Sequence, residues 1–200
     1  MRAARLLPAL VASAVVASTA SAQATLSGFM TVDNIFTTHV STAANVQGVQ
    51  VASGNDWPVT IALASQTLAR GQDYWLQVLG IDTGGVAAFI GTFSLSSPSH
   101  LFANGSTTLS TNVTDWFVSR TGFGASPQTP FSWGPNSTIP WDTRPNIALG
   151  AEYIWSADQC TNCTRYFWTK ITAVPEPGTY VLMATGLAAI AFVARRRRAA

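Results

Sequence analysis

The stretch that best indicates the fold of this chain is Gln72–Leu79, which reads QDYWLQVL. A turn residue, Gly71, comes directly before it. A period of two residues is typical of a β-strand, so this stretch predicts a sheet rather than a helix. Its side chains alternate between two faces, with Tyr74, Leu76 and Val78 on one face and Trp75, Gln77 and Leu79 on the other.

Further stretches of similar composition are separated by clusters of Gly, Asn, Asp, Ser or Pro. Between residues 23 and 173 there is no long apolar pattern with a period of 3.6 residues. Many short strands without helices between them predict an all-β fold, an antiparallel β-sandwich that forms one domain over residues 23–173. The further strands are expected at Gly28–Val32, Ile35–Val40, Val59–Leu63, Ala87–Leu95, Asp115–Ser119, Ile147–Trp155 and Arg165–Thr172.

The segment Gly122–Asn146 contains five prolines and is expected to form one long surface loop. Trp133, Trp141, Asp142 and Arg144 lie close together in it. Flat aromatic faces stack on sugar rings, and neighbouring polar groups bond to hydroxyls, so these four residues are the candidate glycan-binding set. Packing of the same residues against the domain is the alternative, and the sequence favours it.

Charged residues are distributed unevenly along the chain. The whole chain has 11 basic and 9 acidic residues, but residues 23–173 contain five basic and eight acidic ones, a formal charge of −3. The remaining basic residues are arginines near the two ends. The basic isoelectric point therefore does not indicate nucleic-acid binding, and no nucleic-acid partner is expected.

The sequence contains no motif that fixes a reactive geometry, such as a nucleophile elbow or HExxH. Two carboxylates brought together by folding, as in glycoside hydrolysis, would leave no such pattern. A zinc site needs about four ligands, so the only cysteine pair would have to recruit the distant His39 and His100. We expect no enzyme, no catalytic residue, no metal site and no cofactor.

The only cysteines form the sequence Cys160-Thr161-Asn162-Cys163 between two expected strands. In an exported protein they meet an oxidising compartment, which favours a local disulfide between Cys160 and Cys163. Reduced thiols, crosslinking to another chain, and metal or redox chemistry are the alternatives. The extended character of the residues that follow speaks against a redox site, whose first cysteine is normally at a helix N-terminus.

The first 22 residues have the pattern of a secretory signal peptide. Arg2 and Arg5 form a basic region, Leu6–Ala17 an apolar region, and residues 20–22 read Ala-Ser-Ala. This order predicts cleavage between Ala22 and Gln23 and export of the domain that follows.

Residues 174–200 read VPEPGTYVLMATGLAAIAFVARRRRAA. The uncharged stretch 179–194 covers about 24 Å as a helix, which with its flanks predicts a transmembrane helix at about 178–194. Arginines at 195–198 act as a stop-transfer cluster and stay cytoplasmic by the positive-inside rule. The domain before residue 174 is then on the other side of the membrane.

The combination of Pro175-Glu176-Pro177, one short apolar helix and a terminal arginine cluster resembles the PEP-CTERM sorting signal of Gram-negative bacteria. This resemblance implies recognition of the Pro-Glu-Pro triplet by an exosortase, an integral membrane cysteine protease. It also implies transient anchoring in the inner membrane, C-terminal processing, and a final location at the cell surface or outside the cell. A permanent C-terminal anchor is the alternative.

The domain itself resembles a galactose-binding-domain-like jelly roll, as found in bacterial surface proteins and accessory modules of glycosidases. The resemblance rests on short pieces spread over most of residues 23–173. It implies a scaffold and not a sugar site, because function depends on the residues placed on the scaffold. The pieces are Val32–Phe36, Gly54–Trp57, Leu68–Gly71, Val78, Asp82–Val86, Ile154–Ser156 and Tyr166–Trp168.

Two functions from different classes follow from these patterns. The first is a non-enzymatic surface or matrix-associated protein, which the sequence favours. The second is a carbohydrate-binding module that acts on exopolysaccharide or cell-surface glycans.

Overall fold

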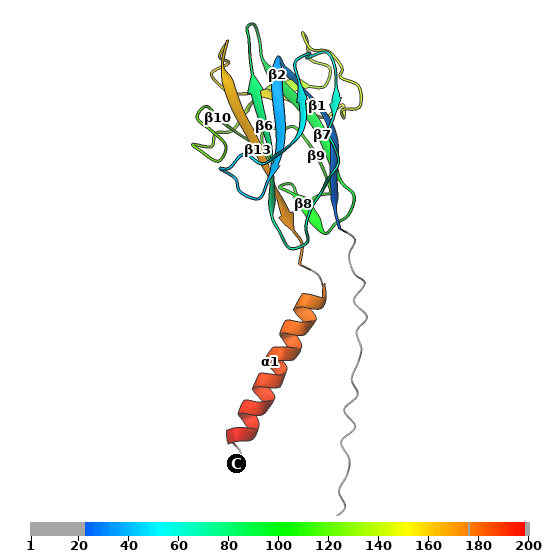
Figure 1. Ribbon diagram of the computed structural model, residues 1–200, viewed down its shortest axis with the longest axis vertical. Helices are drawn as coiled ribbons and strands as arrows, with labels where there is room; N and C mark the ends of the chain where they lie inside the picture. The colour runs from blue at the N-terminus through cyan, green and yellow to red at the C-terminus, as the bar shows by residue number, and fades with distance from the viewer. Residues whose placement is uncertain (1–22, 176, 199–200) are drawn as a thin grey trace, which may run out of the picture. The chain divides into compact units, whose positions relative to one another are not determined.

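A computed structural model describes residues 23–175 and 177–198. The domain before Pro175 is a β-sandwich of two antiparallel sheets, and a single helix, α1 (Pro177–Arg198), follows it. In Figure 1, β2, β6 and β13 lie in one layer, and β1, β7 and β9 lie in the other. The predicted all-β sandwich with a C-terminal helix is therefore confirmed.

The first sheet, called sheet A here, has the strand order β11-β12-β7-β1-β4, with β5 also paired to β1 and β9 also paired to β7. Its longest pairing joins β1 and β7, in register from Leu26 opposite Leu95 to Asp33 opposite Ala88. Its strands are β1 (Thr25–Asp33), β4 (Ile61–Ala62), β5 (Gln66–Thr67), β7 (Ala88–Leu95), β9 (Thr108–Ser110), β11 (Phe131–Pro135) and β12 (Glu152–Trp155).

The second sheet, sheet B, has the order β10-β13-β6-β2-β3, with β8 also paired to β13. Of the stretch predicted first, Gln72–Leu79, residues 74–79 lie in the central strand β6, between β13 and β2, and the strand begins two residues later than expected. Its strands are β2 (Ile35–Ser41), β3 (Val49–Gly54), β6 (Tyr74–Ile81), β8 (His100–Phe102), β10 (Phe117–Ser119) and β13 (Thr164–Ala173).

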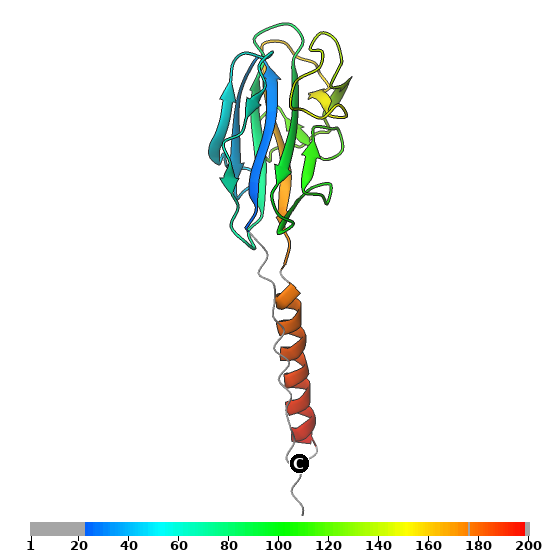
Figure 2. The ribbon, with the colours of Figure 1, turned by 90° about the vertical axis from the view of Figure 1, so that its right-hand side faces the viewer.

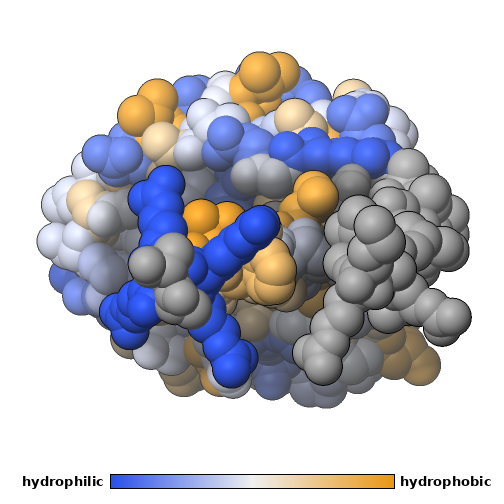
Figure 3. Space-filling model, turned by 90° about the horizontal axis from the view of Figure 1, so that it is seen from below, coloured by the Kyte–Doolittle hydropathy of each residue, from blue (hydrophilic) through white to orange (hydrophobic). Residues whose placement is uncertain are grey.

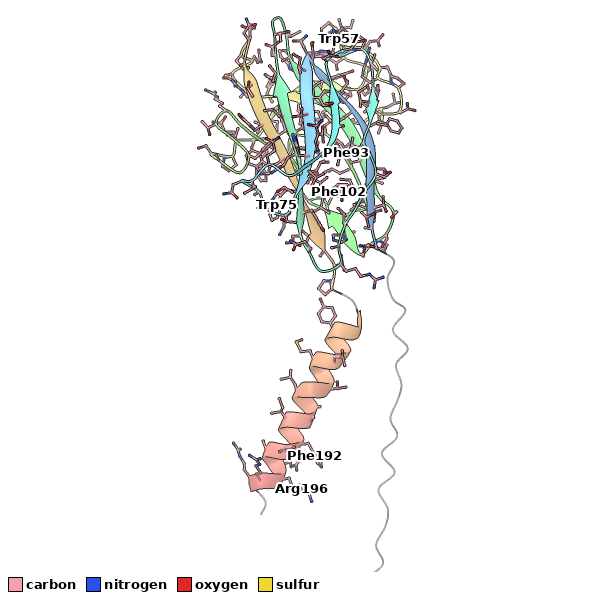
Figure 4. All side chains as sticks on the ribbon, in the orientation of Figure 1. Trp57, Trp75, Phe93, Phe102, Phe192 and Arg196 are labelled. Carbon is pink, nitrogen blue, oxygen red and sulfur yellow. A yellow bond between two sulfur atoms is a disulfide. The ribbon has the colours of Figure 1, made fainter. Side chains whose placement is uncertain are left out.

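Alternate side chains of the two sheets meet between the layers and form one apolar core. Phe89 contacts Trp116 edge-on at 5.1 Å between ring centroids and lies 5.3 Å from Phe167 of the opposite sheet. Figure 4 shows Phe93 and Phe102 between the sheets, and both are buried. Burial of these aromatic side chains, together with the aliphatic residues of the same cluster, stabilises the sandwich.

The outer face of sheet B is covered where β6 carries Gln77, which is fully buried. Its amide nitrogen donates to the carbonyls of Ala44 at 3.1 Å and Val46 at 3.0 Å, and its oxygen accepts from the Gly48 N–H at 3.2 Å. Loop backbone thus satisfies a buried amide that strand alternation placed away from the core.

Several expected boundaries are corrected by tertiary pairing. The segment Gly122–Asn146 is not one surface loop, because Phe131–Pro135 pairs with β12 as β11. The strand expected at Ile147–Trp155 begins only at Glu152, since Ala148 and Ala151 form a turn. The strand expected at Val59–Leu63 is reduced to β4, because Val59 donates to the Asp56 carbonyl in a turn.

The helix α1 begins at Pro177, where the missing N–H of proline is tolerated, and ends at Arg198. In the part of the chain that the structure describes, no helix has the length and apolar character needed to cross a membrane. The transmembrane span expected at 178–194 is therefore not confirmed, although a helix forms there.

Candidate functional site

The sorting segment lies just after the last strand of the sandwich. Pro175 is exposed and non-helical, Glu176 lies outside the described residues, and Pro177 is the first residue of α1. Arg195, Arg196, Arg197 and Arg198 form the last turn and are exposed, where positive charge is favoured by the helix dipole. Figure 3, seen from this end of α1, shows strongly hydrophilic side chains spreading outward.

The structure describes only one of the two residues at the expected signal-peptide cleavage site. Ala22 and the residues before it lie outside the described residues, and Gln23 is the first residue described. The prediction of cleavage between them therefore stays a prediction.

Cys160 and Cys163 form a disulfide in the connection between β12 and β13, with their Cα atoms 6.1 Å apart. The same connection is held by Arg165, whose guanidinium contacts the Asp158 carboxylate at 2.6 Å and the Ser156 hydroxyl at 2.6 Å. The expected disulfide is confirmed, and an ion pair between the buried Arg165 and the exposed Asp158 supports the turn that contains it.

The four candidate glycan-binding residues gather over one half of the outer face of sheet A, together with side chains from distant segments. Trp133 and Trp141 lie 5.7 Å apart between ring centroids, and Trp141 stacks on Tyr153 at 5.0 Å. Figure 2 shows β11 and the loops near it at one end of the sandwich. We call this group the aromatic cap: Trp57, Trp133, Trp141 and Tyr153, over Ala88, Ile90, Ile147 and Ala151.

Trp141 is only 2% exposed, and its indole N–H donates to the Asp33 carboxylate at 2.9 Å. Trp133 is half-buried, and its indole N–H donates to the Ala87 carbonyl at 3.1 Å. Both polar edges are satisfied within the protein, and neighbouring rings cover Trp141. The geometry assigns Trp141 to packing, the alternative that the sequence favoured.

Arg144 and Asp142 take different positions at the edge of the cap. The Arg144 guanidinium lies 5.2 Å from the centroid of the Trp57 ring and donates to the Pro58 carbonyl at 2.9 Å. It also bonds to the Trp141 carbonyl. Asp142 is exposed, while its backbone carbonyl accepts from the Tyr153 hydroxyl at 2.5 Å. Arg144 therefore ties two loops together rather than facing solvent.

Burial changes the acidity of two groups under the cap. It raises the pKa of the Asp33 carboxyl, the Trp141 N–H lowers that pKa in part, and the Asp82 carboxylate raises it further. Burial also raises the pKa of Tyr153 to about 12, against a smaller opposing effect of Arg144. Tyr153 is therefore neutral at physiological pH.

Neither histidine is open to solvent. His39 bonds through Nε2 to the Gln47 amide at 2.8 Å, and burial lowers its pKa. His100 bonds through Nε2 to the Gln72 carbonyl at 3.0 Å and through Nδ1 to the Ser99 hydroxyl at 3.3 Å. Among the described residues, no three His, Cys, Asp or Glu side chains are grouped so that they could hold a metal ion.

Sequence reasoning missed Asp33 and Tyr153 as parts of the cap. Asp33 is the last residue of β1 and lies 108 positions from Trp141, so no local pattern connects them. Tyr153 is in β12, where alternation alone predicts that every second residue faces away from the core. That alternation was the one signal available.

No curated protein and no solved structure matches the chain. The resemblance to galactose-binding-domain-like jelly rolls therefore stays a prediction about a confirmed two-sheet sandwich. One family model does match, and its match covers the exposed Pro175, the whole of α1 and the arginine cluster. Residues 173–198 carry the PEP-CTERM protein-sorting motif, which implies export and membrane-associated sorting toward the cell surface.

Proposed function

We propose that this chain is a non-enzymatic surface or matrix-associated protein whose β-sandwich is cut from its sorting segment by an exosortase-type protease. The proposal rests on the position in the chain at which the sandwich ends. Its last backbone hydrogen bond joins the Val174 N–H to the Ser99 carbonyl at 2.9 Å, and α1 begins at Pro177. The Pro-Glu-Pro triplet of the matched motif thus connects two folded elements. Pro175 is exposed, and exposed segments between folded elements are preferred sites of proteolysis.

A cut in the triplet leaves the sandwich complete. Every buried apolar residue of the core lies between Ala24 and Ile171. Both ends of the domain are held by the loop after β7, since Ser96 exchanges hydrogen bonds with Thr25 at 2.9 and 3.1 Å and Ser99 holds Val174. The product of processing therefore keeps its fold without the segment that was removed.

Two observations support a non-enzymatic role. Both histidines are buried and bonded inside the protein, so neither is available as a general base at the surface. The aromatic cap is closed by its own hydrogen bonds and does not form an open cleft lined by acids. A structural or binding role on the cell surface agrees best with these features.

The test is cell fractionation and immunoblotting of three variants in the native host. Glu176→Ala removes the charge of the triplet, and Pro177→Ala removes the second fixed φ. Leu182→Ile is the matched control, because it keeps apolar volume in the matched segment. The first two variants should accumulate uncut in the cell, and the control should be released normally. Normal release of both triplet variants would reject processing at this motif.

A further inference from the structure

The outer face of sheet A is divided into a covered and an open half along β1. At the covered half, Asp33 bonds to Trp141 and the Thr31 hydroxyl donates to the Trp57 carbonyl at 2.8 Å. Two and four residues before Thr31, Phe29 is 37% exposed and Ser27 is exposed. The aromatic cap therefore ends on the sheet, and beyond it the side chains of this face are exposed or half-buried.

The strand register sets the composition of this open half. Ser27 lies opposite Ser94, and Phe29 lies opposite Thr92 on one side and Ala62 on the other. Thr92 in turn lies opposite Ser110 of β9. The Phe29 ring thus has hydroxyl side chains of β1, β7 and β9 near it on the same face, and Ala62 of β4 on its other side. A groove of about 390 Å³ runs over them, and its lining includes Ser27, Phe29, Thr92, Ser94 and Asn146.

The polar side chains of the groove differ in whether they make hydrogen bonds within the protein. The Thr92 hydroxyl is engaged with Ser110 at 2.9 Å and with the Ala148 N–H at 3.0 Å. Within the described part of the chain, by contrast, the side chains of Ser27, Ser94 and Asn146 make no hydrogen bond. Hydroxyl and amide groups both donate and accept, so these three side chains retain their capacity for an outside partner.

The charge of the groove restricts what that partner is. No Asp, Glu, Lys or Arg is among its lining residues. An anionic ligand would find no cation there, and a cationic ligand no carboxylate. A ring that stacks on the Phe29 face and carries hydroxyls for Ser27, Ser94 and Asn146 has the complementary chemistry. Sugars without a charged substituent fit that description.

We propose that the open half of sheet A, centred on Phe29, binds a neutral polysaccharide. This site is separate from the candidate set that the sequence indicated, which is Trp133, Trp141, Asp142 and Arg144. The two tryptophan rings of that set pack within the aromatic cap. An extended polymer suits a shallow face of adjacent strands better than a small molecule does, since several sugar units lie along it. The proposal does not depend on processing at the Pro-Glu-Pro triplet, because it concerns residues of the sandwich alone.

The experiment is affinity electrophoresis of the full chain in gels that contain dextran, galactomannan or hydroxyethylcellulose, with polygalacturonate as the acidic comparison. Phe29→Thr removes the ring, and Asn146→Gly removes the amide while keeping the left-handed backbone at φ 63°. Phe117→Thr is the matched control, because Phe117 is 46% exposed but lies in sheet B. Melting temperatures of all variants check that each one folds.

At least one neutral polymer should retard the wild-type chain, and Phe29→Thr should weaken that binding about tenfold. Asn146→Gly should weaken it by a smaller factor, and Phe117→Thr should bind as the wild type does. The proposal is overturned if no neutral polymer retards the chain, if only polygalacturonate does, or if Phe29→Thr and Phe117→Thr behave alike. Self-association lost in Phe29→Thr without polymer binding would show instead that the face contacts a second copy of the chain.

Discussion

The indole N–H of Trp141 donates a 2.9 Å hydrogen bond to the carboxylate of Asp33, which joins the proline-rich segment to the end of β1. Through this bond the segment covers half of sheet A instead of extending into solvent. On the same sheet face, the residues under the cap are buried, whereas Phe29 and Ser27, which precede Thr31 in β1, are exposed.

Shortening Trp141 should show how much this contact stabilises the sandwich. Trp141→Phe keeps a ring against Tyr153 but leaves the Asp33 carboxylate without its donor, so we expect a loss of about 1–3 kcal/mol. Trp141→Ala also opens a cavity and should cost about 3–5 kcal/mol. Denaturant unfolding measures both. A loss below about 1 kcal/mol for Trp141→Ala would mean that the cap does not hold the segment.

Removing the disulfide should have a modest effect. The loop between Cys160 and Cys163 is short, and the Asp158–Arg165 ion pair holds the same turn. For the variant with both cysteines changed to Ser we expect a loss of about 1–3 kcal/mol. Alkylation and mass spectrometry of the wild-type protein should detect no free thiol. Two reactive thiols in material taken from outside the cytoplasm would contradict this expectation.

The carboxylate of Asp73 should make stability depend on pH in the acid range. The Lys170 ammonium at 2.7 Å and the Ala173 N–H at 2.9 Å hold its pKa below that of a free aspartate. Because the folded-state pKa is the lower one, the contribution is present above about pH 4, the unfolded value, and is lost as pH falls through the folded value.

We therefore expect Asp73→Asn to lower stability by about 1 kcal/mol at pH 7, since both groups are partly exposed, and to have a smaller effect near pH 2. Thermal or urea unfolding at the two pH values measures the difference. Asp56→Asn is the matched control, because Asp56 is exposed and makes no ion pair with the described residues. Equal effects of the two variants at pH 7 would contradict the assignment.

The sequence predicted the central strands well because their alternation is a local property. Tyr74, Leu76 and Val78 were expected on one face, and the buried Leu76 and Val78 do belong to the core. Local patterns predicted the short cysteine turn and the start of α1 equally well, because spacing and proline chemistry act within a few residues.

The parts that failed depend on partners far away in the chain. The proline-rich segment looked like a loop by composition, but pairing of β11 with β12 and the contact between Trp141 and Asp33 fold it onto the sheet. Strand β3 was missed because its sequence, VQVASG, is too short to show a clear pattern. It is a strand because it pairs with β2. The open face around Phe29 was missed for the same reason, since only the register of β1, β4 and β7 brings its residues together.

The proposed processing requires that the folded sandwich is exported and then separated from its sorting segment. Intact-mass spectrometry of the protein recovered outside cells of the native host measures both ends of the processed chain. We expect the mass of a chain that begins at Gln23 and ends at or near the Pro-Glu-Pro triplet, without Arg195–Arg198. A mass that still includes Met1, or the four arginines, in most of the extracellular protein would contradict it.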